Sequence, residues 1–295
     1  MRRVLTILIL FLAAFFVAIH LFIRPSNDRD WSPDQSILPY AEFNGPYVTV
    51  HNIRNFRYQS TTQWTPAWYD KTFDLRQLDS AWFIVEPFGE THGVAHTFVS
   101  FGFADRDFLA VSVEIRKEKG ETFSALRGLL RQYELMYVAG DERDLIALRA
   151  LYRKDHVYLY PVKTTPERMR KMFVDMMRRA NELRSKPEFY NTLTNNCTTN
   201  IVKQVNAVVP HRVPFSLAVL LPGYSDRYAY KLGLIDTTLP FEEARRRFEI
   251  PRIPVDDEYS VRIRERGFRR QASGVRPLRV RDDRAKRGAC LKPDA

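Results

Sequence analysis

Residues 95–116 read AHTFVSFGFADRDFLAVSVEIR, and this stretch decides the fold. Side chains alternate between apolar and other types in both halves, which predicts two strands with one apolar face each. The five residues 104–108 (ADRDF) suit a short turn, so the strands form an antiparallel hairpin. Because the apolar faces must match, the register of the hairpin is fixed to within two residues.

The opposite face of this hairpin carries groups capable of chemistry. His96 and Ser100 share it on the first strand, and Glu114 and Arg116 share it on the second. In the matching register, His96 lies opposite Glu114 or Arg116, with the other on the diagonal. A carboxylate near an imidazole fixes its tautomer and supports its cationic form. A hairpin with one solvated face would hold the same residue types by chance. Both a functional site and an ordinary solvated face therefore stay open as interpretations.

More strands are predicted around the hairpin, and helices follow. Residues 141–152 have helical spacing, and the clearest helix spans 166–185. Thr165 is its N-cap candidate, Pro166 opens it and Pro187 follows its end. Strands first and helices later favour an α+β fold. The strands are expected at 47–53, 81–86, 95–103, 109–116, 133–139 and 157–161.

One cysteine lies where a nucleophile could act. Asn195 or Asn196 is a good N-cap for the helical pattern that follows, which places Cys197 in the first turn. The helix dipole and unpaired N–H groups there favour a thiolate and offer oxyanion donors. Cys197 precedes Ile201 by four residues, so it shares the core-facing side and can face the sheet that carries His96. The alternative is an inert, buried small residue.

The N-terminal segment predicts a membrane span. Residues 4–23 read VLTILILFLAAFFVAIHLFI, with only Thr6 and His20 as interruptions. A helix of that length measures about 30 Å, the thickness of one hydrocarbon core. The run is longer than a signal-peptide core and its alanines form no cleavage pattern. We therefore expect one uncleaved transmembrane helix and a linker over residues 1–30, in the bacterial inner membrane with the main domain in the periplasm.

Most of the net charge lies at the C-terminus. Of a total of +11, residues 261–295 carry +8, from ten Arg and two Lys against four acidic residues. The body, expected at 31–257, is therefore nearly neutral, which argues against a nucleic-acid partner. The tail has few large apolar residues, so residues 258–295 are predicted to be disordered, as a solubilising segment or a contact with anionic headgroups.

The chain offers little for a metal site. Two cysteines in 295 residues exclude a disulfide scaffold or a four-cysteine zinc site. His92 and His96 have the spacing of a helical zinc pair, but Gly93 and the β-rich run after it argue against a helix there. We predict no metal ion and no organic cofactor.

Four motifs in collinear order resemble one bacterial family. The segments NIRNFRY (52–58), AHTFVSFGF (95–103), SVEIRKEKGE (112–121) and YNTLTNNCTTNIV (190–202) resemble the Lnb N-terminal periplasmic domain, also described as domain of unknown function 4105. The resemblance covers about residues 47–222. It implies a periplasmic domain with a circularly permuted papain-like (NlpC-type) fold, an antiparallel sheet with packed helices in which the His strand precedes the Cys helix.

The same resemblance implies a mechanism. Cys197 would be the nucleophile and His96 its base, with Glu114 chosen as the orienting group. Main-chain N–H groups near Cys197 would hold the oxyanion, and Asn196 is expected among the oxyanion- or substrate-binding residues. The function implied is a membrane-anchored, cysteine-dependent acyltransferase or hydrolase that acts on an ester or amide of a lipid or lipoprotein through a thioester.

The NIRNFRY motif contributes Arg54, Arg57 and Tyr58. If the motif borders the site, an arginine would hold a phosphate or carboxylate and Tyr58 would donate to an oxyanion. If it is only a strand with exposed arginines, it does neither.

The lipoprotein N-acyltransferase after which the family is named has further membrane spans after this domain, whereas only the basic tail follows here. Two functions of other classes therefore stay open. One is a non-catalytic periplasmic interaction module with Cys197 as packing. The other is a cell-wall peptidase or amidase. The expected partners are a membrane lipid or lipoprotein as substrate and the bilayer itself.

Overall fold

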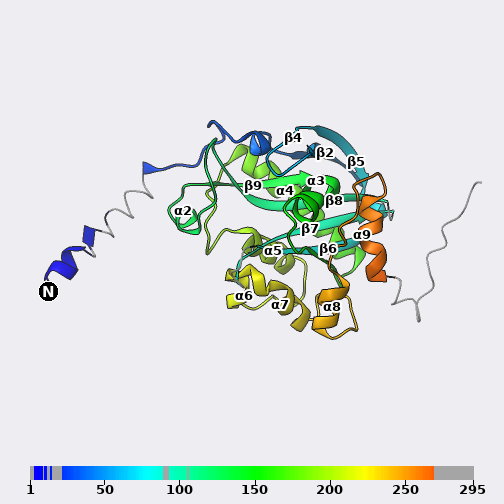
Figure 1. Ribbon diagram of the computed structural model, residues 1–295. Coiled ribbons are helices and arrows are strands. Elements are labelled where there is room, and N and C mark those ends of the chain that lie inside the picture. Colours follow the sequence, from blue (N-terminus) through cyan, green and yellow to red (C-terminus); the bar gives the residue numbers. More distant parts are fainter. Residues whose placement is uncertain are drawn as a thin grey trace, which may run out of the picture.

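The computed structural model describes residues 3–8, 10–11, 14, 22–88, 93–104 and 106–268. Within these ranges the largest sheet has eight strands (Figure 1). Its order is β1, β2, β9, β8, β7, β6, β10, and β5 also pairs with β2. Neighbours run antiparallel except β2 and β9, which are parallel. The strands are β1 Tyr40–Asn44, β2 Tyr47–Arg54, β5 Trp68–Asp74, β6 Leu78–Pro87, β7 Ala95–Phe103, β8 Asp107–Arg116, β9 Glu134–Gly140 and β10 Tyr158–Pro161.

The β7–β8 hairpin has the predicted alternation. Its register pairs Phe98 with Ser112 and Phe101 with Leu109. The predicted strands at 47–53, 81–86, 133–139 and 157–161 correspond to β2, β6, β9 and β10. The sequence patterns did not identify β1, β5 or the short pair β3 (Arg57–Tyr58) and β4 (Trp64–Thr65).

One face of the sheet is covered by α4 (Pro166–Ser185) and α5 (Cys197–Asn206), and we call it the α4–α5 face. Its core joins Val99 of β7 to Phe173 of α4 and Ile201 of α5. All three side chains are at most 5% exposed. The odd-numbered, apolar residues of the hairpin therefore point to this face.

The opposite face is covered by α3 (Glu142–Ala147), the π-helical turn η3 (Leu148–Tyr152) and α9 (Tyr259–Phe268). We call it the α3–α9 face. Its core joins Phe98 of β7 to Leu145 of α3. The even-numbered residues of the hairpin point to this side, so helices lie against both faces of the sheet.

The two predicted helix starts are confirmed. Thr165 caps α4 by accepting a hydrogen bond from the Arg168 N–H, and Pro166 occupies the first turn. Asn196 caps α5. The remaining helices are α2 Ala125–Leu129, α6 Leu217–Leu220, α7 Ser225–Lys231 and α8 Phe241–Arg247, with 3-10 turns at Pro33–Gln35, Leu75–Gln77 and Pro222–Tyr224.

The prediction of a transmembrane helix is wrong for this structure. No helix in the described part of the chain combines the length and apolar character that crossing a bilayer requires. Residues 9, 12–13 and 15–21 of the predicted span lie outside the described residues. The mixed α+β architecture with one main sheet is what the structure has.

The predicted C-terminal boundary at residue 257 falls before the end of the folded body. In α9, Tyr259 and Ile263 are buried, and Arg264 forms an ion pair with Glu142 at 2.5 Å. This helix was predicted as part of the disordered tail, but its apolar side chains complete the core of the α3–α9 face. Residues 269–295, most of the predicted tail, lie outside the described residues.

Candidate functional site

The start of α5 is fixed by its own side chains. Asn196 accepts a hydrogen bond from the Thr199 N–H, and the Thr199 hydroxyl accepts one from the Asn196 N–H, which forms a capping box. Cys197 therefore occupies the first position of the helix. It is only 6% exposed and belongs to the same core as Tyr190 and Ile201.

Asn196, expected beside an oxyanion, is occupied in shaping the loop before α5. While its Oδ1 accepts the capping hydrogen bond, its Nδ2 donates to the Thr192 carbonyl at 2.7 Å. Its side chain is buried. Both polar ends are used within the protein, so Asn196 does not present a free donor to a substrate.

The sheet separates Cys197 from His96. Thr198, next to Cys197, meets Thr97 of β7 with 3.0 Å between their hydroxyl oxygens, so α5 contacts the side of β7 that carries Thr97. Consecutive strand residues point to opposite faces. His96 accordingly points to the α3–α9 face, where its Nε2 is 2.7 Å from the Ser112 hydroxyl. The predicted contact between thiol and imidazole is absent, because α5 packs on the apolar face of the hairpin.

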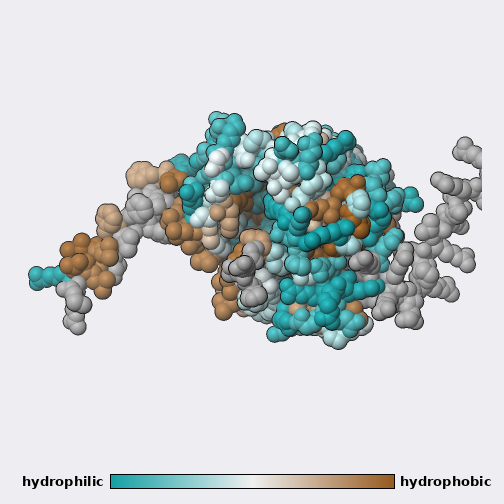
Figure 2. Space-filling view, viewed as in Figure 1, coloured by the Kyte–Doolittle hydropathy of each residue, from teal (hydrophilic) through white to brown (hydrophobic). Residues whose placement is uncertain are grey.

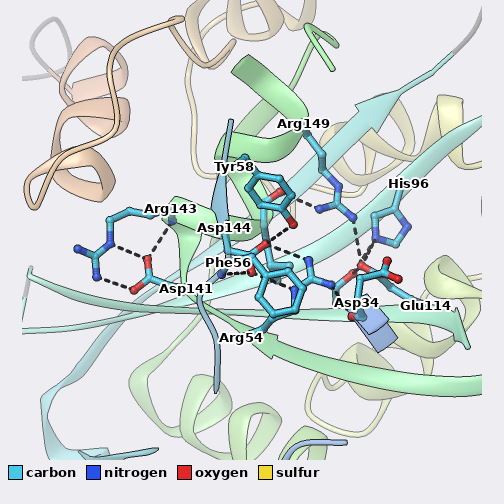
Figure 3. A network of polar contacts seen from close by, with 12 residues as sticks. Asp34, Arg54, Phe56, Tyr58, His96, Glu114, Asp141, Arg143, Asp144 and Arg149 are labelled. Atoms are coloured by element: carbon cyan, nitrogen blue, oxygen red, sulfur yellow. Dashed lines mark hydrogen bonds and ion pairs between the residues drawn. The ribbon is translucent and has the colours of Figure 1, made fainter. Parts of the chain in front are cut away.

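A cluster of buried charges surrounds His96 instead (Figure 3). Arg149 of η3 donates from Nε to Glu86 of β6 at 2.6 Å and from Nη2 to Glu114 of β8 at 3.1 Å. The Ser112 hydroxyl donates to Glu114 at 2.9 Å, and His96 Nε2 lies 3.8 Å from the same carboxylate. We call these five residues the charged cluster.

Burial and the charge of Arg149 together set the protonation states of His96 and Glu114. Burial, and after it the charge of Arg149, lower the pKa of His96 to about 3. Burial alone would raise the pKa of Glu114, but Arg149 and then His96 hold it well below its usual range. Near neutral pH the carboxylate is thus ionised and the imidazole neutral. An ionised carboxylate only accepts hydrogen bonds, so we assign the proton of His96 to Nε2, which donates to Ser112.

The carboxylate was expected to support a cationic imidazole. Glu114 is indeed near His96, but its negative charge is already matched by Arg149. The cation in this cluster is the guanidinium, and a second positive charge beside it is disfavoured.

The NIRNFRY motif serves a neighbouring buried cluster. Asp144 of α3 accepts two hydrogen bonds from the Arg54 guanidinium at 3.0 Å each, and one from the Tyr58 hydroxyl at 3.1 Å (Figure 3). Burial, and then Asp144, raise the pKa of Tyr58, which stays a neutral donor. Arg57 is exposed on β3. Tyr58 is held on the α3–α9 face, so it does not reach Cys197 as a substrate-binding residue.

An apolar cavity of about 110 Å³ lies on the α4–α5 face, beside α5. Thr198, Ile201 and Val205 line it with helical spacing along one side of α5. Two cationic side chains, Lys163 and Arg168, also contribute to its lining. Other walls come from β7, α4, α6 and α7, among them Val99, Met169, Val219 and Ala229.

The sequence patterns did not identify Arg149 or the cavity. Arg149 follows Leu145 by four residues, and a charge on the apolar side of a predicted helix is a usable signal of a buried ion pair. The cavity has no local signal, because its walls come from several elements far apart in the sequence. His92 of the rejected zinc pair lies outside the described residues.

A family model described as the Lnb N-terminal periplasmic domain matches residues 64–223, more than half of the chain. The match includes the hairpin, the charged cluster and α5, whereas the NIRNFRY motif at 52–58 precedes it. Comparison with curated proteins and with solved structures gave no match. The papain-like resemblance therefore stays a prediction.

Proposed function

The chain belongs to the family of Lnb N-terminal periplasmic domains, and from this premise we propose that it binds the acyl chain of a lipid or lipoprotein. The observation that carries the proposal is the apolar cavity beside α5. The residues that match the family model include Thr198 and Val205 in its wall, so the cavity is largely built from the family domain itself.

The cavity has room for part of an acyl chain. An apolar cavity of about 150 Å³ holds one benzene molecule, so the volume of about 110 Å³ admits a segment of about four carbon atoms. Burial of each methylene stabilises a complex by about 0.8 kcal/mol. Water has few polar partners along these walls, so an apolar ligand is favoured over solvent.

Lys163 and Arg168 supply the polar end of the proposed site. Lys163 is exposed just after β10, and Arg168 is partly buried in the first turn of α4. Both side chains line a cavity that is otherwise mainly apolar. This combination fits an amphiphile with an anionic group, such as a fatty acid carboxylate or a phospholipid phosphate.

The test is a titration of the full chain, kept in amphipol without detergent, with the fluorescent fatty acid cis-parinaric acid. We expect saturable binding that palmitate displaces. Val205→Phe fills the cavity and is expected to weaken binding at least tenfold. Val255→Phe, at an exposed position outside the cavity lining, is the matched control and should bind like the wild type. Equal binding by Val205→Phe and the wild type would overturn the proposal.

Acyl transfer or hydrolysis through Cys197 is a second candidate, favoured by the position of the thiol. Cys197 is the first residue of a ten-residue helix, where unpaired N–H groups can hold an oxyanion, and the next residue, Thr198, lines the cavity. The sulfur would attack the carbonyl of an ester or amide, and the alcohol or amine would leave with the thiol proton. Water or an amine would then release the acyl group from the thioester. His96 takes no part in this route.

Intact-mass analysis after incubation with p-nitrophenyl octanoate tests the second candidate. In a Cys290→Ser background, we expect the mass of one octanoyl group to be added, to be absent from Cys197→Ala and to persist in His96→Gln. If no adduct forms on Cys197, the second candidate fails, whereas the binding proposal is decided separately by the fatty-acid titration.

A further inference from the structure

Large apolar side chains are exposed at one end of the molecule. They come from the connection between β8 and β9 that contains α2, from the loop before α5, and from the segment around α6. Their exposed fractions range from 43% to 78%. We call this region the α2–α6 surface, and its members are Phe123, Leu126, Leu193, Phe215, Leu217 and Leu221.

Both parts of the α2–α6 surface lie around the start of α5. The Thr192 hydroxyl, just before α5, donates to the Ala125 carbonyl at 2.7 Å. A Cβ added at Gly128 would lie 2.4 Å from the same hydroxyl oxygen, so α2 sits closely on this loop. On the other side, the Gly223 N–H donates to the Gly93 carbonyl, two residues before β7. Figures 1 and 2 show α2 and α6 on the same side of the body, with apolar patches there.

The two stretches of sequence that supply the apolar side chains of the α2–α6 surface contain basic but no acidic residues. No acidic residue occurs between Glu188 and Asp226, or between Glu121 and Glu134. Exposed cations in these stretches include Arg127, Lys203 and Arg212. Apolar side chains flanked by cations are typical of a surface that enters the interface of a membrane with anionic lipids.

The chain also enters the body at this end. The Ser26 N–H donates to Glu134 at 3.1 Å, and Arg29 forms an ion pair with the same carboxylate at 3.0 Å. Glu134 is the first residue of β9, directly after the α2 connection. The sequence before this anchoring point, residues 4–23, is almost wholly apolar. An apolar sequence thus leads into the body at the end that carries the apolar α2–α6 surface and its cations. This favours lipid over a second copy of the chain or a protein partner as the occupant of that surface.

We propose that the α2–α6 surface docks on a bilayer with anionic headgroups, with the apolar side chains of α2 and α6 entering its interfacial region. In α6, Ala218 and Val219 line the cavity while Leu217 is exposed, so one helix separates the lipid-facing surface from the cavity. The docking surface exists whether or not the cavity holds an acyl chain, and the two ideas are tested by separate measurements.

The test uses the full chain in a Cys290→Ser background, since Cys197 is buried. An environment-sensitive NBD label is attached at Leu126→Cys or Leu217→Cys, with Val255→Cys as the matched exposed control. In phosphatidylethanolamine–phosphatidylglycerol vesicles, we expect blue-shifted emission and at least twofold quenching by doxyl lipids at positions 126 and 217, but not at 255. Replacing the mixture with phosphatidylcholine should weaken both effects, and high salt should do the same.

Three results would each overturn the proposal or a part of it. Labels at 126 and 217 that stay as water-exposed in vesicles as the label at 255 would show that this surface does not meet lipid. A concentration-dependent blue shift at 126 and 217 without vesicles would assign the surface to a second copy of the chain. Unchanged immersion in phosphatidylcholine would refute the role of anionic headgroups.

Discussion

The two faces of the sheet differ in how their polar groups are satisfied. On the α3–α9 face, Arg149 donates to Glu86, to Glu114 and, from Nη1, to the Leu145 carbonyl at 2.7 Å. On the α4–α5 face, mainly apolar side chains surround a cavity of about 110 Å³. Charges that are matched to each other leave little capacity for a ligand, whereas an apolar cavity has it. The buried charged residues therefore stabilise one face, and the proposed ligand site lies on the other.

The largest expected effect is on the charged cluster. Arg149→Met leaves Glu86 and Glu114 buried without their partner, and breaking a buried ion pair in this way costs about 3–5 kcal/mol. We expect the free energy of unfolding, measured by urea titration, to fall by about that amount. The folded fraction should still bind fatty acid, because the cavity is on the other face.

Arg153→Met is the matched control for this prediction. Arg153 also lies near Glu86, at 3.5 Å, but its side chain is 47% exposed. Its loss should change the free energy of unfolding by no more than about 1 kcal/mol. If Arg149→Met cost as little, the charged cluster would not be a stabilising network, and the contrast between the faces would fail.

The second effect is on the dependence of stability on pH. The pKa of His96 is lowered to about 3 in the folded chain, so the unfolded chain binds this proton more readily. The contribution of His96 to the free energy of unfolding is fully present above about pH 6.5. It is lost as the pH falls toward 3, by up to about 1.4 kcal/mol per pH unit. His96→Gln keeps a donor for Ser112 and should flatten this part of the curve. A curve for His96→Gln as steep as that of the wild type would contradict the assignment of a neutral imidazole.

Much of the fold could be predicted because its signals are local. The N-cap Thr165, the Pro166 that follows and the apolar stripe of α4 are all contained in one helix. The alternation of β7 and β8 likewise depends only on neighbouring residues. By contrast, α9 was missed because its two buried apolar residues, Tyr259 and Ile263, stand in an arginine-rich stretch that matches no simple pattern.

The candidate site could not be predicted in the same way, because it depends on which face α5 covers. The alternation had already separated His96 from Val99 and Phe101, and an apolar stripe on α5 is best buried against the apolar face. That argument places Cys197 and His96 on different faces of the sheet. The expectation that the two groups meet followed from the core-facing position of Cys197 and from the order of the motifs along the chain, and neither specifies a face of the sheet.

A smaller effect is expected at the start of α5. Asn196→Ala removes the capping hydrogen bond to the Thr199 N–H and should lower the free energy of unfolding by about 1 kcal/mol. Asn196→Asp keeps the capping acceptor but loses the donor to the Thr192 carbonyl, so comparing the two variants separates the two hydrogen bonds. Because Thr198 lines the cavity, Asn196→Ala should also weaken cis-parinaric acid binding, whereas Arg149→Met should not. Equal binding losses in both variants would indicate that the two faces are coupled.

The smallest expected effect is the one that separates the faces most directly. If the sheet isolates the thiol from the imidazole, His96→Gln leaves the rate at which iodoacetamide alkylates Cys197 within about twofold of wild type, measured by intact mass in a Cys290→Ser background. Low urea should speed alkylation of both proteins equally, since the thiol is only 6% exposed and is reached through locally opened states. A tenfold slower reaction in His96→Gln would mean that the imidazole activates the thiol after all. In that case β7 would have to present His96 to the α4–α5 face in another arrangement, and the hydrogen bond from His96 to Ser112 would be broken whenever the thiol reacts.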